Sequence, residues 1–455
     1  MRQRIENAQK EIDSKKMIVQ NGKMRQHYHF MPQSGWMNDP NGLIFFNGQY
    51  HVFYQTNPYN GFWDCMHWGH AVSKDLVHWE YLPLALAPSE EYDDYQKGGC
   101  FSGSAIEHEG KLYVFYTATA NHGNGSEQSQ CLAISEDGIN FEKYDGNPLF
   151  DAPEGIQPDS FRDPKVWKHE NKYYMVVGAS RNNRGLALIY ESADLYHWNF
   201  LNVLAESRGE WGFMWECPDF YQLGDKYVLT FSPMGSGDHT SVYLTGDFDY
   251  KTGKFDWHIS GEMDWGFDFY APQTFETPVG RRILIGWAGV PDAEYSSNPM
   301  NEGWQHSLTV PRELRYHNGK IYQLPIRELG QLRKKEILPE KESYVLDNGC
   351  GELIFDGIAG SSSAAICVQI GTGCSLFYEK GLVTLQFTDD SGAGRGKRVA
   401  RCEAVHKIQI LMDVSILEIY INDGEIVMTS RIFFPGKDAT VRFLGQAEMI
   451  QAWQL

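Results

Sequence analysis

A short turn followed by an alternating apolar strand recurs about every 50 to 60 residues through the first two thirds of the chain. Such a turn before a run of β-branched and aromatic residues is typical of a β-hairpin. Each copy therefore predicts the middle of a small antiparallel sheet. The five copies are NGQYHVFYQ from Asn47, EGKLYVFYT from Glu109, ENKYYMVVG from Glu170, LGDKYVLTF from Leu223 and VGRRILIGW from Val279.

A second motif follows the first three copies at a similar interval. It reads SKDLVHWE from Ser73, SEDGINFE from Ser135 and SADLYHWN from Ser192, and each copy delivers an aromatic residue to the next strand. Two linked motifs in a constant order indicate a true internal repeat. Four-stranded units repeated radially form a propeller. Five units therefore predict a five-bladed β-propeller whose loops converge on one axial pocket.

The pattern changes after Pro311. A charged connector, ELGQLRKKEILPEKE, is followed by alternating strands without the repeat, and Asn422-Asp423-Gly424 is a strong hairpin signal between two of them. These features predict a β-sandwich. The predicted fold is thus all-β, with a charged N-terminal segment at 1–26, a five-bladed β-propeller catalytic domain at 27–325, a linker at 326–340 and a β-sandwich domain at 341–455.

Composition excludes some classes of partner. A net charge of −19 argues against nucleic-acid binding, because that affinity comes mainly from Lys and Arg neutralising phosphates. The first 17 residues lack a signal-peptide core, and no run of about 18 apolar residues follows. We therefore expect a cytoplasmic protein without membrane contact, whose homo-oligomeric state the sequence leaves open. The eight cysteines show no CxxC or Cys/His spacing, which indicates reduced thiols and no metal site.

Three acidic residues beside structure-breaking residues are the candidate chemistry: Asp39 in WMNDPNG, Asp163 in FRDPKVW and Glu216 in MWECPDF. Taken singly, Asp39 fits a surface turn, Asp163 a local ion pair with Arg162, and Glu216 the end of a strand. They belong to different repeat units, however, so a propeller would bring their loops to one pocket. Two carboxyl groups about 5 to 5.5 Å apart cleave glycosidic bonds with retention. The three together therefore favour a sugar hydrolase.

Five segments carry a family resemblance: WMNDPNG, FSGSA from Phe101, RDP from Arg162, ECPDF from Glu216 and APQTF from Ala271. In this order and at this spacing they closely resemble glycoside hydrolase family 32, which includes invertases, sucrose-6-phosphate hydrolases, inulinases and levanases. The resemblance runs across nearly the whole chain. It implies a five-bladed propeller followed by a β-sandwich, the same fold that the repeats predict.

The resemblance also implies residue roles. Asp39 matches the nucleophile, Glu216 the acid/base, and Asp163 the residue that binds fructose hydroxyls and stabilises the transition state. No metal or organic cofactor is implied. The residues placed around the fructosyl unit are Asn38, Gln55, Trp63, Phe101, Ser102, Arg162, Tyr270 and Trp287.

Two of these residues have a further interpretation. Trp63 could instead be a packed loop aromatic, since Trp68 and Trp79 lie close in the sequence. Arg162 directly precedes Asp163, and a fixed cation there would lower the pKa of that carboxylate and keep it ionised.

The expected activity is that of a retaining β-fructofuranosidase acting on a small fructoside: sucrose, sucrose 6-phosphate or a short fructo-oligosaccharide. Fructan exohydrolysis of inulin or levan and fructosyl transfer are the alternatives. An arabinanase or xylosidase propeller would not carry WMNDPNG and ECP, and an inactive sugar-binding propeller would be expected to lack one of the three carboxylates.

The leaving group is less well defined. Phe62-Trp63-Asp64-Cys65 departs from the family pattern after the Trp, which leaves leaving-group specificity open. A phosphate site would need cations near the mouth of the pocket. The candidates are Arg181, Arg184, His122 and His239, for which solvated loop positions are the alternative.

Overall fold

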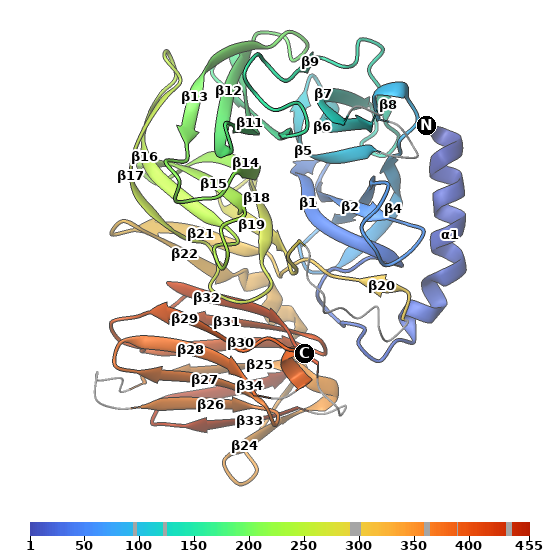
Figure 1. Ribbon diagram of the computed structural model, residues 1–455. Coiled ribbons are helices and arrows are strands. Elements are labelled where there is room, and N and C mark those ends of the chain that lie inside the picture. The colour runs from blue at the N-terminus through green and yellow to red at the C-terminus, as the bar shows by residue number, and fades with distance from the viewer. Residues whose placement is uncertain (94–97, 122–124, 292–301, 359–364, 389, 434–438) are drawn as a thin grey trace.

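The computed structural model describes residues 1–93, 98–121, 125–291, 302–358, 365–388, 390–433 and 439–455 (Figure 1). Five antiparallel sheets form the upper body and two further sheets form a separate lower body (Figure 1). A single long helix, α1 (Arg2–Gln20), runs along the first sheet. Short 3₁₀ turns lie at η1 (Glu91–Asp93), η3 (Arg327–Leu332), η4 (Asp347–Gly349) and η5 (Asp390–Gly392).

The five sheets of the upper body are the predicted blades. In chain order they comprise β1 (Gly35–Phe46), β2 (Gln49–Asn57), β3 (His67–Ser73) and β4 (Trp79–Leu86); β5 (Gly99–His108), β6 (Lys111–Asn121), β7 (Ser126–Ser135), β8 (Glu142–Lys143) and β9 (Phe150–Asp151); β10 (Phe161–His169), β11 (Lys172–Arg181), β12 (Arg184–Ser192) and β13 (Asn199–Glu206); β14 (Met214–Leu223), β15 (Lys226–Met234), β16 (Val242–Asp249) and β17 (Lys254–Glu262); and β18 (Tyr270–Glu276), β19 (Arg282–Trp287), β21 (Arg312–His317) and β22 (Lys320–Pro325). A short strand, β20 (Trp304–Gln305), pairs in parallel with β1.

The first strands of the blades line the axis. Contacts run in a closed cycle from β1 to β5, β10, β14, β18 and back to β1. The predicted turns join the first and second strands of each blade, as at Asn47 and Gly48, where φ is 48° and 80°. Two positive φ values match the right-handed twist of the strands, which is why Asn-Gly occurs there. The prediction that each copy forms the middle of a blade is confirmed.

The lower body is a sandwich of two six-stranded sheets. One sheet has the order β23-β34-β25-β30-β31-β32 and the other β24-β33-β26-β27-β28-β29. Their bounds are β23 (Lys335–Glu336), β24 (Ser343–Leu346), β25 (Cys350–Asp356), β26 (Ile366–Ile370), β27 (Cys374–Glu379), β28 (Leu382–Phe387), β29 (Lys397–Arg401), β30 (Lys407–Asp413), β31 (Ile416–Ile421), β32 (Ile426–Arg431), β33 (Ala439–Leu444) and β34 (Met449–Gln454).

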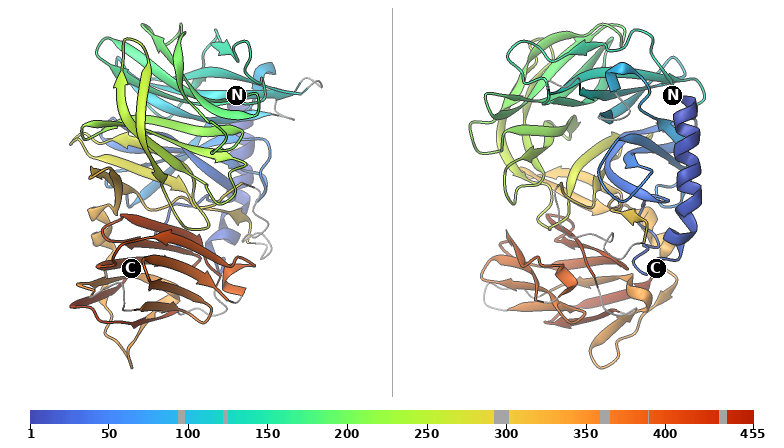
Figure 2. Two further views of the ribbon diagram at one scale, coloured as in Figure 1. Left: turned by 60° about the vertical axis from the view of Figure 1, so that its left-hand side comes forward. Right: turned by 45° about the vertical axis from the view of Figure 1, so that its right-hand side comes forward.

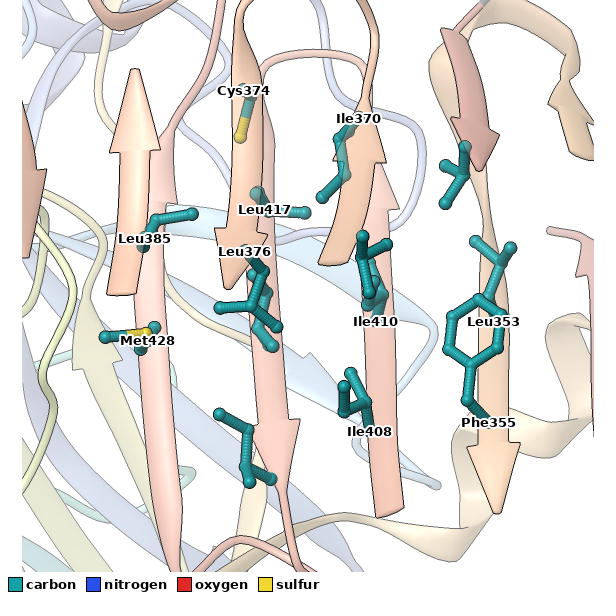
Figure 3. Packing of buried hydrophobic residues seen from close by; sticks show 14 of the residues in the cluster. Leu353, Phe355, Ile370, Cys374, Leu376, Leu385, Ile408, Ile410, Leu417 and Met428 are labelled. Carbon is teal, nitrogen blue, oxygen red and sulfur yellow. The ribbon is translucent and has the colours of Figure 1, made fainter. Parts of the chain in front are cut away.

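Apolar side chains from both sheets fill the sandwich. Leu353 and Ile410 come from one sheet, and Leu376 and Leu385 come from the other, all of them buried (Figure 3). Within the range predicted as linker, η3 forms and β23 already pairs with β34. The four-part division of the chain stays a prediction.

Buried charges join the two bodies. Arg312 of β21 donates to Glu418 of β31 at 2.7 Å, and His29 contacts both Glu418 and Asp413 at 2.9 Å. Burial disfavours the charged imidazole, but the hydrogen bonds to the two carboxylates raise the pKa of His29 to about 9. Each of these buried charges has a partner of opposite sign, which offsets the cost of removing it from water.

Candidate active site

The first strand of every blade contains a β-bulge near its start. At each bulge two residues face one residue of the neighbouring strand, and a bulge of this kind turns side chains in a new direction. The bulges lie between Met37 and Pro40 in β1, Cys100 and Gly103 in β5, Arg162 and Lys165 in β10, Glu216 and Asp219 in β14, and Tyr270 and Gln273 in β18.

The three candidate carboxylates therefore lie within strands and not on the loops from which the sequence analysis expected them to converge. Asp39 belongs to β1, Asp163 to β10 and Glu216 to β14. That expectation was wrong because the motif residues that looked like strand breakers instead create bulges inside the strands.

Three of the bulges contain a residue with positive φ directly before a proline. The φ values are 69° at Asp163, 48° at Cys217 and 46° at Ala271. Such a backbone is uncommon outside glycine and persists only where the surrounding structure holds it. The same unusual geometry thus recurs on three blades at the axis.

The bulges surround a cavity of about 470 Å³ at one end of the propeller axis. Every site residue predicted from the sequence lines it: Asn38, Asp39, Gln55, Trp63, Phe101, Ser102, Arg162, Asp163, Glu216, Tyr270 and Trp287. Their roles toward a substrate remain a proposal. Residues that the sequence reasoning missed also line it: Trp36, Ser126, Gln128, Asp159, Met234 and Pro291.

Asp39 is held by three donors. Its Oδ1 accepts from Asn38 Nδ2 at 3.0 Å, and its Oδ2 accepts from Ser102 Oγ at 2.5 Å and from Cys217 Sγ at 3.3 Å. The indole of Trp36 in turn donates to Asn38 Oδ1 at 2.8 Å. Burial raises the pKa of Asp39, and the Ser102 hydroxyl opposes that shift by stabilising the carboxylate.

Both carboxylate oxygens of Glu216 accept hydrogen bonds from neighbouring side chains. Its Oε1 accepts from Arg162 Nε at 3.1 Å and Nη2 at 2.8 Å, and its Oε2 accepts from the hydroxyl of Tyr270 at 2.6 Å. The guanidinium of Arg162 also donates to Gln128 Oε1 at 3.3 Å. Arg162 of β10 and Tyr270 of β18 therefore fix the orientation of this carboxylate, and Gln128 of β7 helps to hold Arg162.

Asp163 has only a long ion pair with Arg162, the neighbour that the sequence suggested. Arg162 Nε lies 4.0 Å from Asp163 Oδ2, and the guanidinium instead bonds to Glu216. Burial outweighs the cation and raises the pKa of Asp163 to about 7, with the charges of Glu216 and Asp39 adding to the rise. Arg162 does lower this pKa, as expected, but burial outweighs it, so the expectation that the cation keeps Asp163 ionised was wrong.

Cys217 lies between the two aspartates. Its backbone N–H donates to Asp163 Oδ2 at 2.8 Å, and its sulfur lies 3.3 Å from Asp39 Oδ2 and 3.5 Å from Asp163 Oδ2. The two carboxylates therefore face each other across one sulfur atom. Its place directly after Glu216 in ECPDF is the signal by which the sequence could have included it.

Aromatic rings form the walls of the cavity. Trp287 is buried beside Tyr270, with ring centroids 5.9 Å apart, whereas Trp63 is 56% exposed at the rim and meets Phe101 edge-on at 5.8 Å. Trp63 is therefore not a packed loop aromatic. Flat apolar faces next to hydrogen-bonding groups suit a sugar ring.

The candidate phosphate ligands that the structure describes are absent from the lining of this cavity. Arg181 pairs with Glu206 at 2.7 Å, and His239 pairs with Glu262. Arg184 sits exposed on the same hairpin as Arg181, and His122 lies outside the described residues. Within the described part of the chain, Arg162 is the one Lys, Arg or His side chain in the cavity lining, and it is bound to Glu216.

Within the same described ranges, three or more His, Cys, Asp or Glu side chains nowhere gather into a group that could hold a metal ion. A search of the described helices finds none with the length and apolar character needed to span a bilayer.

We expect Asp163→Asn to stabilise the fold at neutral and higher pH. The pKa of Asp163 is about 7 in the folded protein, against an ordinary value of 3.8. Its contribution to the free energy of unfolding is therefore fully present below about pH 4 and is lost as the pH rises through 7, because the buried carboxyl must then ionise. The amide avoids that loss and tolerates positive φ. At about 1.4 kcal/mol per pKa unit, the gain in unfolding free energy at pH 8 should be at most about 4 kcal/mol.

Thermal unfolding of both proteins between pH 4 and pH 8 measures this difference, which should shrink toward pH 4. Asp159→Asn is the control, because Asp159 lines the same cavity but is exposed. A difference that is independent of pH would show that burial of the charge is not its cause.

The chain matches two profiles of one family. "Glycosyl hydrolases family 32 N-terminal domain" matches residues 29–325, and "Glycosyl hydrolases family 32 C terminal" matches residues 378–452. The sucrose-6-phosphate hydrolase of Bacillus subtilis (strain 168) is 36% identical over 98% of both chains. That of Escherichia coli is 39% identical and covers 90% of this chain and 89% of its own.

Solved structures agree. A family 32 β-fructofuranosidase of Bombyx mori superposes with a TM-score of 0.88 at 34% identity, covering 99% of this chain and 97% of its own. The sucrose-6-phosphate hydrolase of Lactobacillus gasseri gives a TM-score of 0.88 at 27% identity, with 98% and 96% covered. A mutant of the Bombyx mori enzyme was solved in complex with sucrose.

Proposed function

The chain belongs to glycosyl hydrolases family 32 and is a glycoside hydrolase, and from this premise we propose that it cleaves the β-fructofuranosidic bond of sucrose and sucrose 6-phosphate with retention. Relatives named sucrose-6-phosphate hydrolase or raffinose invertase support a substrate built on sucrose. The observation that carries the proposal is the meeting of Asp39 and Glu216 in one cavity with different hydrogen-bond partners.

The two carboxyl groups would divide the work. Asp39, oriented by Asn38 and Ser102, attacks the anomeric carbon and forms a fructosyl ester. Glu216 protonates the departing glycosidic oxygen and then removes a proton from the water that hydrolyses the ester. Two different environments allow one carboxyl to act as nucleophile and the other as acid and base.

Asp163 would bind the sugar. Its carboxylate accepts from the backbone N–H of Cys217, and sugar hydroxyls that donate to it would favour its ionised form. A negative charge held there stabilises the positive charge that develops on the fructosyl ring in the transition state.

The experiment that tests this proposal measures kcat/KM for sucrose, sucrose 6-phosphate, 1-kestose, inulin and levan by released fructose. We expect release from both sucrose and sucrose 6-phosphate. Because the one cation in the described lining is bound to Glu216, a strong preference for the phosphate would require a cation from elsewhere. Preference for 1-kestose or fructans would favour the exohydrolase alternative, and no release from any substrate would refute the proposal.

Fructosyl transfer, a cytoplasmic location and a homo-oligomer are further proposals for this protein. Fructosyl transfer uses the same ester, captured by a sugar hydroxyl in place of water, so product analysis at high sucrose concentration tests it. A cytoplasmic location and a homo-oligomer are likewise proposed, and gel filtration with light scattering tests the latter.

We expect Arg162→Lys to lower kcat/KM for sucrose about 10- to 100-fold, because one ammonium cannot reproduce the two bonds to Glu216 and the bond to Gln128. Steady-state kinetics with a thermal melt measures the effect. Arg181→Lys, whose partner Glu206 lies outside the cavity, is the control. Equal losses in both variants would contradict a specific role.

A further inference from the structure

Helix α1 lies against the first blade (Figure 2) and contacts β4. Its buried residues are Ala8, Ile12 and Val19, and the first two pack with Leu84 of β4. With so few buried residues, the apolar contact of this 19-residue helix is small. Individual hydrogen bonds from α1 to the propeller therefore contribute strongly to the position of the propeller segments beside the helix.

One polar contact reaches the segment from the last residue of β2 to the start of β3, residues 57–66, which we call the rim loop. Lys15 Nζ donates to the backbone carbonyl of Tyr59 at 2.5 Å. The same ammonium pairs with Glu11 one turn earlier at 2.6 Å, which holds the lysine side chain along the helix. The Tyr59 ring also packs at the edge of the Ala8 and Ile12 cluster.

The rim loop transmits this contact through its own hydrogen bonds. Asn57 is buried, and its Nδ2 donates to the carbonyl of Phe62 at 2.9 Å and to Asn60 Oδ1 at 3.2 Å. Asn60 Oδ1 also accepts from the N–H of Phe62 at 2.9 Å. The loop is thus one bonded unit, so fixing Tyr59 fixes Phe62 and the residue that follows it, Trp63.

Trp63 is the part of this unit that reaches the cavity. It is 56% exposed at the rim, whereas Asp163 is buried and Asp39 is half-buried in the same cavity. A ring at the mouth faces the end of the substrate that leaves, because the fructosyl unit must sit on the carboxylates below. We infer that α1, through Lys15, positions Trp63 against the leaving-group sugar. This inference rests on the proposed function.

The test compares two substrates that differ only in the leaving group. For Lys15→Met we expect KM for sucrose to rise about three- to tenfold, the range for the loss of one hydrogen bond, with little change in kcat. For methyl β-D-fructofuranoside, whose leaving group is too small to reach the rim, both constants should stay within about twofold of wild type. A general loss of fold would affect both substrates alike.

Three further variants sharpen the test. Lys15→Arg should restore the wild-type KM, because a guanidinium can also donate to a carbonyl. Lys16→Met is the matched control, since Lys16 pairs with Asp13 on the exposed face. In a Trp63→Ala background, Lys15→Met should add nothing, because the residue it positions is gone.

Two results would overturn the inference. One is an unchanged KM for sucrose in Lys15→Met, and the other is an equal change for sucrose and the methyl fructoside. If the wild-type enzyme releases no fructose from sucrose, the proposed function is refuted and the inference falls with it. An active wild-type enzyme with an unaltered Lys15→Met variant refutes the inference alone.

Discussion

The Asp39→Asn variant should lose kcat for sucrose by a factor on the order of 10⁴ to 10⁶, the range found when a catalytic nucleophile is removed. An amide keeps the shape of the carboxylate but cannot form the fructosyl ester. The fold should survive: burial outweighs the hydrogen bonds that stabilise the Asp39 carboxylate and raises its pKa, so a neutral group at this position should not lower stability. Melting temperature should therefore stay at or above that of wild type.

The measurement follows fructose release by the variant purified from a host without its own invertase. Asp159→Asn is the matched control, because it makes the same change on the same cavity at an exposed position. That control should keep kcat within about tenfold of wild type. Substantial turnover by Asp39→Asn, with contamination excluded, would remove Asp39 as the nucleophile and with it the retaining mechanism.

Local signals explain why the blades could be predicted from the sequence. Asn47-Gly48 and its counterparts specify a hairpin within a few residues, so neither the turn nor the strand after it depends on distant contacts. The positions of the bulges could also have been predicted from the sequence. At each bulge a residue pair stands directly before a proline or glycine, and the pairs are Asn38-Asp39, Phe101-Ser102, Arg162-Asp163, Glu216-Cys217 and Tyr270-Ala271.

Contacts between blades could not be predicted from the sequence. The guanidinium of Arg162 has Asp163 next to it in the chain, yet it bonds to Glu216, which lies 54 residues away. That choice depends on how far one bulge turns its side chain relative to the next, which no local pattern encodes. The same holds for Lys15 and Tyr59, which lie 44 residues apart and meet only because α1 packs on β4.

The division of roles between the carboxylates has a consequence for the first half of the reaction. If Glu216 supplies the proton for the leaving oxygen, Glu216→Gln should lower kcat for sucrose about 10²- to 10⁴-fold. A para-nitrophenyl β-D-fructofuranoside needs no such proton, because nitrophenolate is a stable anion. Formation of the fructosyl ester from that substrate should therefore fall less than about tenfold, which a burst of nitrophenolate in rapid mixing measures.

The second half of the reaction gives an independent check on the same variant. Without Glu216 no base activates water, so the fructosyl ester on Asp39 should accumulate and steady-state turnover of the nitrophenyl substrate should be slow. Azide needs no base, so adding it should restore turnover and yield fructosyl azide with retained configuration. Glu206→Gln alters a glutamate that pairs with Arg181 outside the cavity. Its turnover should be close to that of wild type on both substrates and should not rise when azide is added. Equal losses on both substrates, without rescue by azide, would show that Glu216 serves binding and not proton transfer.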